Sequence, residues 1–197
     1  MTLNELIAEV YTITNRPDLV AQTLTAIRSA TLKLHQQDYF YKDIFETGVS
    51  FTSAEYLQQI EYRTLVPRWR ALKYIRKTDS TAYQDGAFLD VLSVPEMVED
   101  AYRINRNDVC YVAGEVVQIR SSTQLQYILL GCYRNPDITQ AGYNSWIALD
   151  HPYAIVFEAA SRVFKMIGDT DQFAAYTELA QMQAAEVSMS NIQAIGY

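Results

Sequence analysis

Apolar residues in the first 37 positions of the chain recur every three or four residues, the spacing that places them along one side of a helix. The periodic positions are Leu3, Leu6, Ile7, Val10, Tyr11, Val20, Leu24, Ile27 and Leu34. Thr2 is a good N-cap, and the first predicted helix ends at Asn15. Pro17 suits a first helical turn, so a second helix is predicted from Pro17 to about Gln37.

The same spacing returns near the end of the chain. The periodic positions there are Ile155, Val156, Ala159, Ala160, Val163, Phe164, Ile167, Phe173, Tyr176, Ala180, Ala184 and Val187. Pro152 fits the first turn of one helix, and Gly168 fits its left-handed C-cap. Asp169, with Gln172 three residues later, predicts the start of the next helix. A helical hairpin is therefore expected at this end.

Between these regions the apolar period shortens to about two, and β-branched and aromatic residues are frequent. Phe45–Phe51 and Tyr56–Tyr62 are expected to pair as strands around residues 52–55. Ala71–Arg76 is interpreted as a strand, with a short helix as the alternative. The remaining predicted elements are a strand at Phe88–Leu92, a helix at Val94–Tyr102, a hairpin of Val109–Ala113 and Val116–Arg120 around Gly114-Glu115, and a third strand at Gln124–Tyr133 that stops at Asn135-Pro136.

This order of elements predicts an α+β fold in which N-terminal and C-terminal helices form a helical bundle with an inserted antiparallel β-rich region. The bundle is expected from residues 1–37 and 150–190, the inserted region from residues 38–149, and a C-terminal tail from residues 191–197. No run of Pro, Gly and Ser marks a linker between these parts.

The formal charge of −7 disfavours a protein that holds nucleic acid on a basic face. Six cations nevertheless fall within Arg63–Lys77, and the chain has fifteen tyrosines, a residue type enriched at interfaces. The cations fit a solvated face, ion pairs between subunits, or contact with an acidic partner or a phosphate backbone. The tyrosines equally fit the edge of a core. The candidates for a subunit interface are Arg63, Arg68, Arg70, Lys73, Tyr153 and Tyr176.

Residues that support catalysis or metal binding are sparse. Cys110 and Cys132 lie in apolar strand-like runs and are expected to be buried and reduced. His35 is interpreted as a helix cap or surface residue, and the acidic residues of Glu96–Asp100 as a solvated face. No recognised catalytic, phosphate-binding or metal-binding motif is present. We therefore expect no enzymatic activity, cofactor or metal, and a soluble chain without signal peptide or membrane span.

The arrangement resembles the head-to-tail adaptor proteins of tailed bacteriophages. Two N-terminal helices precede a β-rich middle ending in "LQYILLGCYRNPDIT" and a closing pair of helices, "LDHPYAIVFEAASRVFKMIGDTDQFAAYTEL". Pro152, the alanine-rich aromatic stripe that follows it and Gly168 are structural signatures of that pattern. The resemblance implies a structural virion protein that forms a ring, usually twelve-fold, between the portal and the tail tube or nozzle. DNA then passes through the lumen without specific binding.

The resemblance places the protein at the head–tail interface of the virion, and in the host cytoplasm during assembly. The segment "SMSNIQAIGY" is expected to follow the last helix as a tail that orders on the portal. Its candidate portal contacts are Met189, Ile192, Ile195 and Tyr197. Two alternatives remain open: a monomeric binding or regulatory module, and a metal-dependent enzyme of a nucleic-acid pathway.

Overall fold

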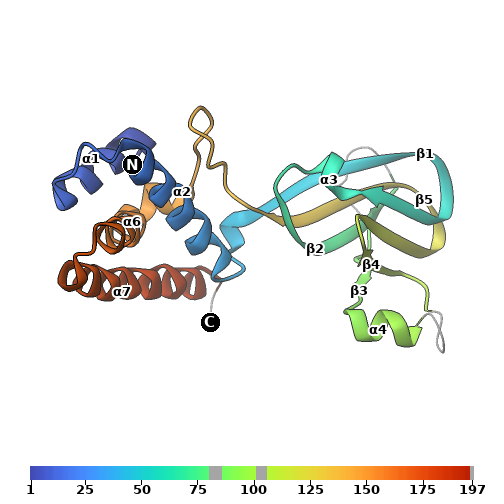
Figure 1. Cartoon of the computed structure of the whole chain (residues 1–197). Coiled ribbons are helices and arrows are strands. Elements are labelled where there is room, and N and C mark those ends of the chain that lie inside the picture. Colours follow the sequence, from blue (N-terminus) through green and yellow to red (C-terminus); the bar gives the residue numbers. More distant parts are fainter. Residues whose placement is uncertain (80–85, 101–105, 196–197) are drawn as a thin grey trace. The chain divides into compact units, whose positions relative to one another are not determined.

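The computed structural model describes residues 1–79, 86–100 and 106–195, and it confirms the predicted α+β class. These residues form seven α-helices and a mixed five-stranded sheet. The chain divides into two compact units: a helical unit, Met1–Asp43 with Asn135–Tyr197, and a sheet unit, Ile44–Arg134 (Figure 1). The chain therefore leaves the helical unit after residue 43 and returns to it at residue 135. The boundaries predicted from the sequence were residues 37 and 150.

The helical unit holds both ends of the chain. Its elements are α1 (Leu3–Thr14), α2 (Val20–Gln36), a 3-10 helix (Tyr41–Asp43), α5 (Trp146–Asp150), α6 (Pro152–Ile167) and α7 (Thr170–Ile195). Thr2 caps α1 in a capping box with Glu5, as its sequence position predicts. The predicted start of the second helix is wrong, because α2 begins at Val20. Arg16 binds Asp18 through two hydrogen bonds of 2.8 Å, and this pair accompanies the turn that precedes α2.

The predicted helical hairpin is confirmed, with one correction at its end. Gly168 takes the left-handed conformation after α6, and Asp169 accepts the backbone N–H of Gln172. The expected tail is instead helical, because α7 continues to Ile195. No glycine or proline interrupts residues 170–195, and buried Asn191 accepts a hydrogen bond from the backbone of Tyr41.

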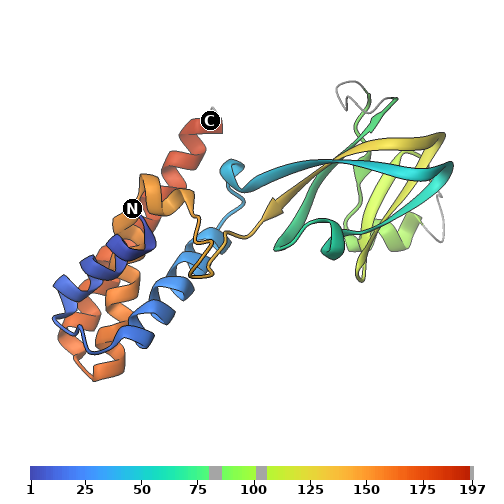
Figure 2. The same cartoon turned by 90° about the horizontal axis from the view of Figure 1, so that it is seen from above.

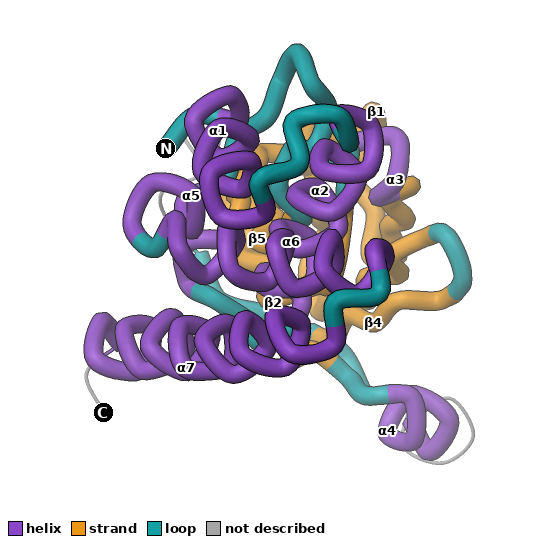
Figure 3. Tube along the Cα trace, turned by 60° about the vertical axis from the view of Figure 1, so that its left-hand side comes forward, coloured by secondary structure: helices purple, strands orange, loops and turns teal. Residues whose placement is uncertain are grey.

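Helix α6 lies between α2 and α7, and it packs against both (Figure 3). Its buried residues meet those of α1 and α2 in one core. The largest buried side chains of this core are Leu6, Ile27, Leu34, Phe40, Ile147 and Ile155. The helical unit is thus a layered bundle with α6 at its centre.

The sheet unit is organised around one long strand. Its elements are β1 (Ile44–Glu61), α3 (Tyr62–Leu65), β2 (Trp69–Thr78), β3 (Asp90–Val91), α4 (Val94–Glu99), β4 (Val109–Ala113) and β5 (Val116–Arg134). Strand β5 pairs antiparallel with β1 along most of its length, and Figure 2 shows the two ribbons side by side. On its other side β5 pairs with β4 and then with β2, and β3 joins β4 in parallel.

Two predicted turns of the sheet are absent. The expected hairpin around residues 52–55 is wrong, because β1 runs on through this segment with register shifts between Ser50 and Leu57. The predicted third strand is part of β5 itself. At a register shift the alternation of apolar and polar residues is interrupted. One long strand with such a shift therefore has the sequence pattern of two shorter strands.

The other predictions for the sheet unit hold in large part. Strand β2 includes the predicted Ala71–Arg76, and the hairpin of β4 and β5 turns at Gly114, whose φ is +63°. Strand β5 ends before Asn135-Pro136 as expected. The predicted strand at Phe88–Leu92 reduces to β3, and the predicted helix at Val94–Tyr102 is described only to Asp100.

Candidate interaction surface on the helical unit

Helix α7 has an inner face that completes the core. Phe173 and Tyr176 are half-buried, while Ala180 and Val187 are buried. The ring of Tyr176 stacks on that of Phe164 from α6, with centroids 5.3 Å apart. This inner face is the stripe that the sequence predicts.

The opposite face of α7 is also rich in apolar side chains, but in the described structure it lies open. Its large apolar residues are Leu179 (39% exposed), Met182 (59%), Met189 (59%) and Ile192 (46%), and Ala175 and Ala185 are exposed beside them. Glu178 and Glu186 stand one turn before and after Met182 on this face. We call the exposed residues from Ala175 to Glu186 on this side the outer face of α7. A helix that merely closes a bundle carries mainly polar residues on its exposed side, and this one does not.

Helix α2 offers a second exposed surface with few charges. Its exposed or half-buried residues on this side are Ala21, Gln22, Thr25, Ser29, Leu32, Lys33 and Gln36. A hollow of about 480 Å³ lies between α2 and α6, lined by Ala21, Thr25 and Ser29 from α2 and by Arg162 and Met166 from α6. We call this hollow the α2–α6 groove.

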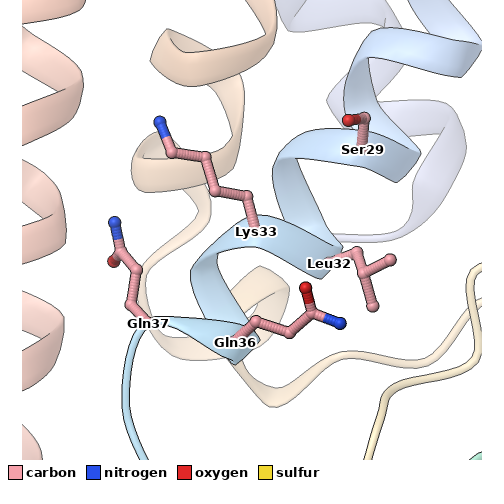
Figure 4. A pocket seen from close by; sticks show the side chains of 5 residues that line it. All are labelled: Ser29, Leu32, Lys33, Gln36 and Gln37. Atoms are coloured by element: carbon pink, nitrogen blue, oxygen red, sulfur yellow. The ribbon is translucent and has the colours of Figure 1, made fainter.

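A second hollow, of about 400 Å³, adjoins the α2–α6 groove along α2, because Ser29 lines both. Figure 4 shows its lining residues, with Lys33 extending from α2 toward α6. Lys33 and Arg162 both bind Glu158, through contacts of 2.9 Å. Two cations therefore share one carboxylate, and the edge of the groove keeps a net positive charge.

The helical unit also contains a buried polar network that sequence reasoning missed. His35 is 1% exposed, so its assignment as a cap or surface residue is wrong. Its Nδ1 lies 2.8 Å from Oδ1 of Asp43, and its Nε2 lies 2.9 Å from Oγ of Ser145. The indole N–H of Trp146 donates to the same Asp43 oxygen at 2.8 Å.

Ser145, His35 and Asp43 contact one another in the order of the hydroxyl, imidazole and carboxylate of a serine catalytic triad. Here, however, the Ser145 hydroxyl also accepts the backbone N–H of Ala148 as the N-cap of α5, and the residue is buried. The network joins α2 to Asp43, the last residue before β1, and to the start of α5. Its contacts satisfy buried polar groups where the chain leaves the helical unit. No sequence spacing reveals it, because its members come from distant positions.

The six predicted interface residues are divided between the two units. Four belong to the sheet unit, where Arg63 pairs with Glu115 at 3.2 Å and Lys73 lies over the ring of Tyr133. Arg68 has a positive φ before β2, and Arg70 lies in β2. In the helical unit, Tyr153 is exposed on α6 and Tyr176 is half-buried in the hairpin. Their role between subunits remains a prediction.

Of the predicted portal contacts, Met189 and Ile192 are exposed on α7. Ile195 is the last residue of that helix, and Tyr197 lies outside the described residues.

Of the acidic residues interpreted as a solvated face, Glu96 and Glu99 in α4 are exposed as expected, whereas Asp100 is not. Asp100 is 1% exposed and binds Arg106 and Arg120, so the solvated-face interpretation is wrong for this residue. The pKa of Asp100 is lowered mainly by the hydrogen bond that its carboxylate accepts from the backbone N–H of Arg106. Nearby, Lys77 and then Ser122 lower the pKa of Asp108 well below its usual range. Asp100 and Asp108 therefore form ion pairs with Arg and Lys side chains.

The expected burial of both cysteines is confirmed. Desolvation raises the pKa of Cys110 to about 12 and that of Cys132 to about 11. Across residues 1–79, 86–100 and 106–195, no three His, Cys, Asp or Glu side chains come together in a way that could hold a metal ion. In the same part of the chain, no helix has the length and apolarity needed to cross a membrane.

Comparison with known proteins does not assign this surface to a family. No family model matches the chain, and no curated protein sequence matches it either.

Proposed function

We propose that the protein is a head-to-tail adaptor of a tailed bacteriophage, a structural virion protein whose copies form a ring between the portal and the tail. The proposal rests on the order of elements described above and on one structural observation. That observation is the outer face of α7, which exposes Leu179 and Met182 at the centre of a long helix. Apolar surface of this kind marks an interaction site on a soluble domain.

The charge of the helical unit supports the proposal. Its residues include twelve acids and six Lys or Arg residues, against eleven and ten in the sheet unit. A surface with excess negative charge repels phosphates, so DNA could move past it without being held. The ring is expected to be twelve-fold, with a tail tube or nozzle protein on its other side.

In this proposal Met189 and Ile192, near the end of α7, contact the portal together with Ile195 and Tyr197. Because this segment is helical and Asn191 is part of the packed face, deletion of residues 188–197 would damage the helical unit itself. Substitution of exposed residues is the cleaner perturbation. Met189→Ser with Ile192→Ser should leave the melting temperature nearly unchanged, since both side chains are exposed.

The test is co-sedimentation of the protein with its cognate portal ring. We expect wild-type protein to sediment with the portal and the double variant to remain in the supernatant. Gln181→Ser, at an exposed polar position of α7 about two turns before Met189, is the matched control and should bind like wild type. Wild-type protein that stays monomeric and unbound would contradict the adaptor proposal and favour the monomeric binding module.

A further inference from the structure

We infer that the outer face of α7 in one copy packs against the α2–α6 groove of the next copy. The inference rests on the proposed ring, and it names the two surfaces that form the contact between neighbouring subunits. Both surfaces belong to the helical unit, so the contact needs no particular placement of the sheet unit.

Charge is the first argument for a second copy of this chain as the occupant. Helix α7 carries three acids, Asp171, Glu178 and Glu186, and no Lys or Arg. Helix α2 carries Arg28 and Lys33 and no acid. The few charges on the two helices are thus of opposite sign, which favours pairing of α7 with α2 over pairing of α7 with another α7.

Shape gives the second argument. On α2 the groove is lined mainly by short side chains, those of Ala21, Thr25, Ala26 and Ser29, with the longer Gln22 beside them. The outer face of α7 projects the long side chains of Leu179 and Met182. Long side chains on one helix and short ones on the other allow close approach of two helices through ridges and grooves. Glu178 and Glu186, one turn on either side of Met182, then lie within reach of Lys33 and Arg162 at the groove edge.

The position of the two surfaces gives the third argument. Helices α2 and α7 lie on either side of α6, as Figures 1 and 3 show. A contact between two different surfaces of the same chain is heterologous, and repetition of such a contact closes a ring when the rotation between copies allows it. In such a ring, α2 of each copy would be followed by α7 of the next copy, and the order α7, α6, α2 would repeat around the circumference.

Cysteine cross-linking tests the inference directly. The native thiols of Cys110 and Cys132 are buried with raised pKa values, so they contribute little background. Thr25→Cys places a thiol on the α2 side of the groove, and Met182→Cys places one at the centre of the α7 outer face. The variants are assembled with the cognate portal ring and treated with a mild oxidant.

We expect a ladder of covalent oligomers, up to the ring, from the chain that carries both substitutions. An equal mixture of the two single variants should give covalent dimers only, and Met182→Cys alone should give none. Gln181→Cys with Thr25→Cys is the matched control, and it should cross-link at least ten-fold less. Glu178→Lys with Glu186→Lys should prevent ring formation while leaving the melt unchanged, since both residues are exposed.

The outcomes separate the inference from the proposed function. Rings of the expected mass without Thr25–Met182 cross-links would overturn the inference and leave the adaptor proposal standing. Dimers of Met182→Cys alone would show that α7 pairs with α7, which also overturns it. Failure of wild-type protein to form any ring on the portal would overturn both.

Discussion

Replacing Phe164 by alanine should destabilise the helical unit by about 3–5 kcal/mol, the usual range for a buried Phe→Ala substitution. Phe164 is 5% exposed at the centre of the α6 stripe, and its ring stacks on Tyr176 with centroids 5.3 Å apart. The stacked pair accounts for about 0.5–1.5 kcal/mol of the loss, and the cavity left in the hairpin accounts for most of the rest. A loss of this size is a large share of a domain's stability of about 5–15 kcal/mol.

Circular dichroism at a helix-sensitive wavelength during chemical unfolding measures this loss in the helical unit. Met166→Ala is the matched control, because Met166 lies two residues away on α6 and is exposed. It should change the free energy of unfolding by less than about 0.5 kcal/mol. If Phe164→Ala unfolds at the same denaturant concentration as wild type, the assignment of Phe164 to the core is wrong.

Three further predictions concern acid, thiols and metals. Because folding lowers the pKa of Asp108, its stabilising contribution is complete above its unfolded pKa of 3.8 and declines as the pH falls below it. Asp108→Asn should therefore lower the melting temperature at pH 7 and flatten its fall toward pH 3; a fall as steep as in wild type would refute this. At pH 8 only about one thiol in a thousand or fewer is ionised when its pKa is 11 or higher, so Cys110 and Cys132 should react with a thiol reagent only after unfolding; rapid labelling of native protein would show that they are accessible. A chelator should change neither the melting temperature nor assembly, and a shift of several degrees would revive the metal-dependent enzyme.

Local signals predict most of the helical unit. Thr2, Gly168 and Asp169 each give the backbone a hydrogen bond or a conformation that fixes a helix end, and the structure uses all three. Such signals act within a few residues, which is why they can be recognised in the sequence. Helix α2 begins later than the sequence predicts, because Pro17 fits a turn as readily as a first helical turn.

The parts that could not be predicted depend on residues distant in sequence. The continuation of β1 through residues 52–55 depends on its pairing with β5, which comes much later in the chain. The contacts of His35 with Asp43 and Ser145 exist only once the bundle has formed. The outer face of α7 cannot be recognised in the sequence for a different reason. Its apolar residues alternate with those of the inner face, so the helix has no single apolar side in the sequence.

Electron microscopy of the protein incubated with its cognate portal ring tests the central claim most directly. The adaptor proposal predicts class averages with one additional annular layer on the portal, with the rotational symmetry of a closed ring and an open lumen. A copy number of twelve would match the expectation from the resemblance. Portal rings without an added layer, beside protein that remains a monomer by mass photometry, would contradict the account.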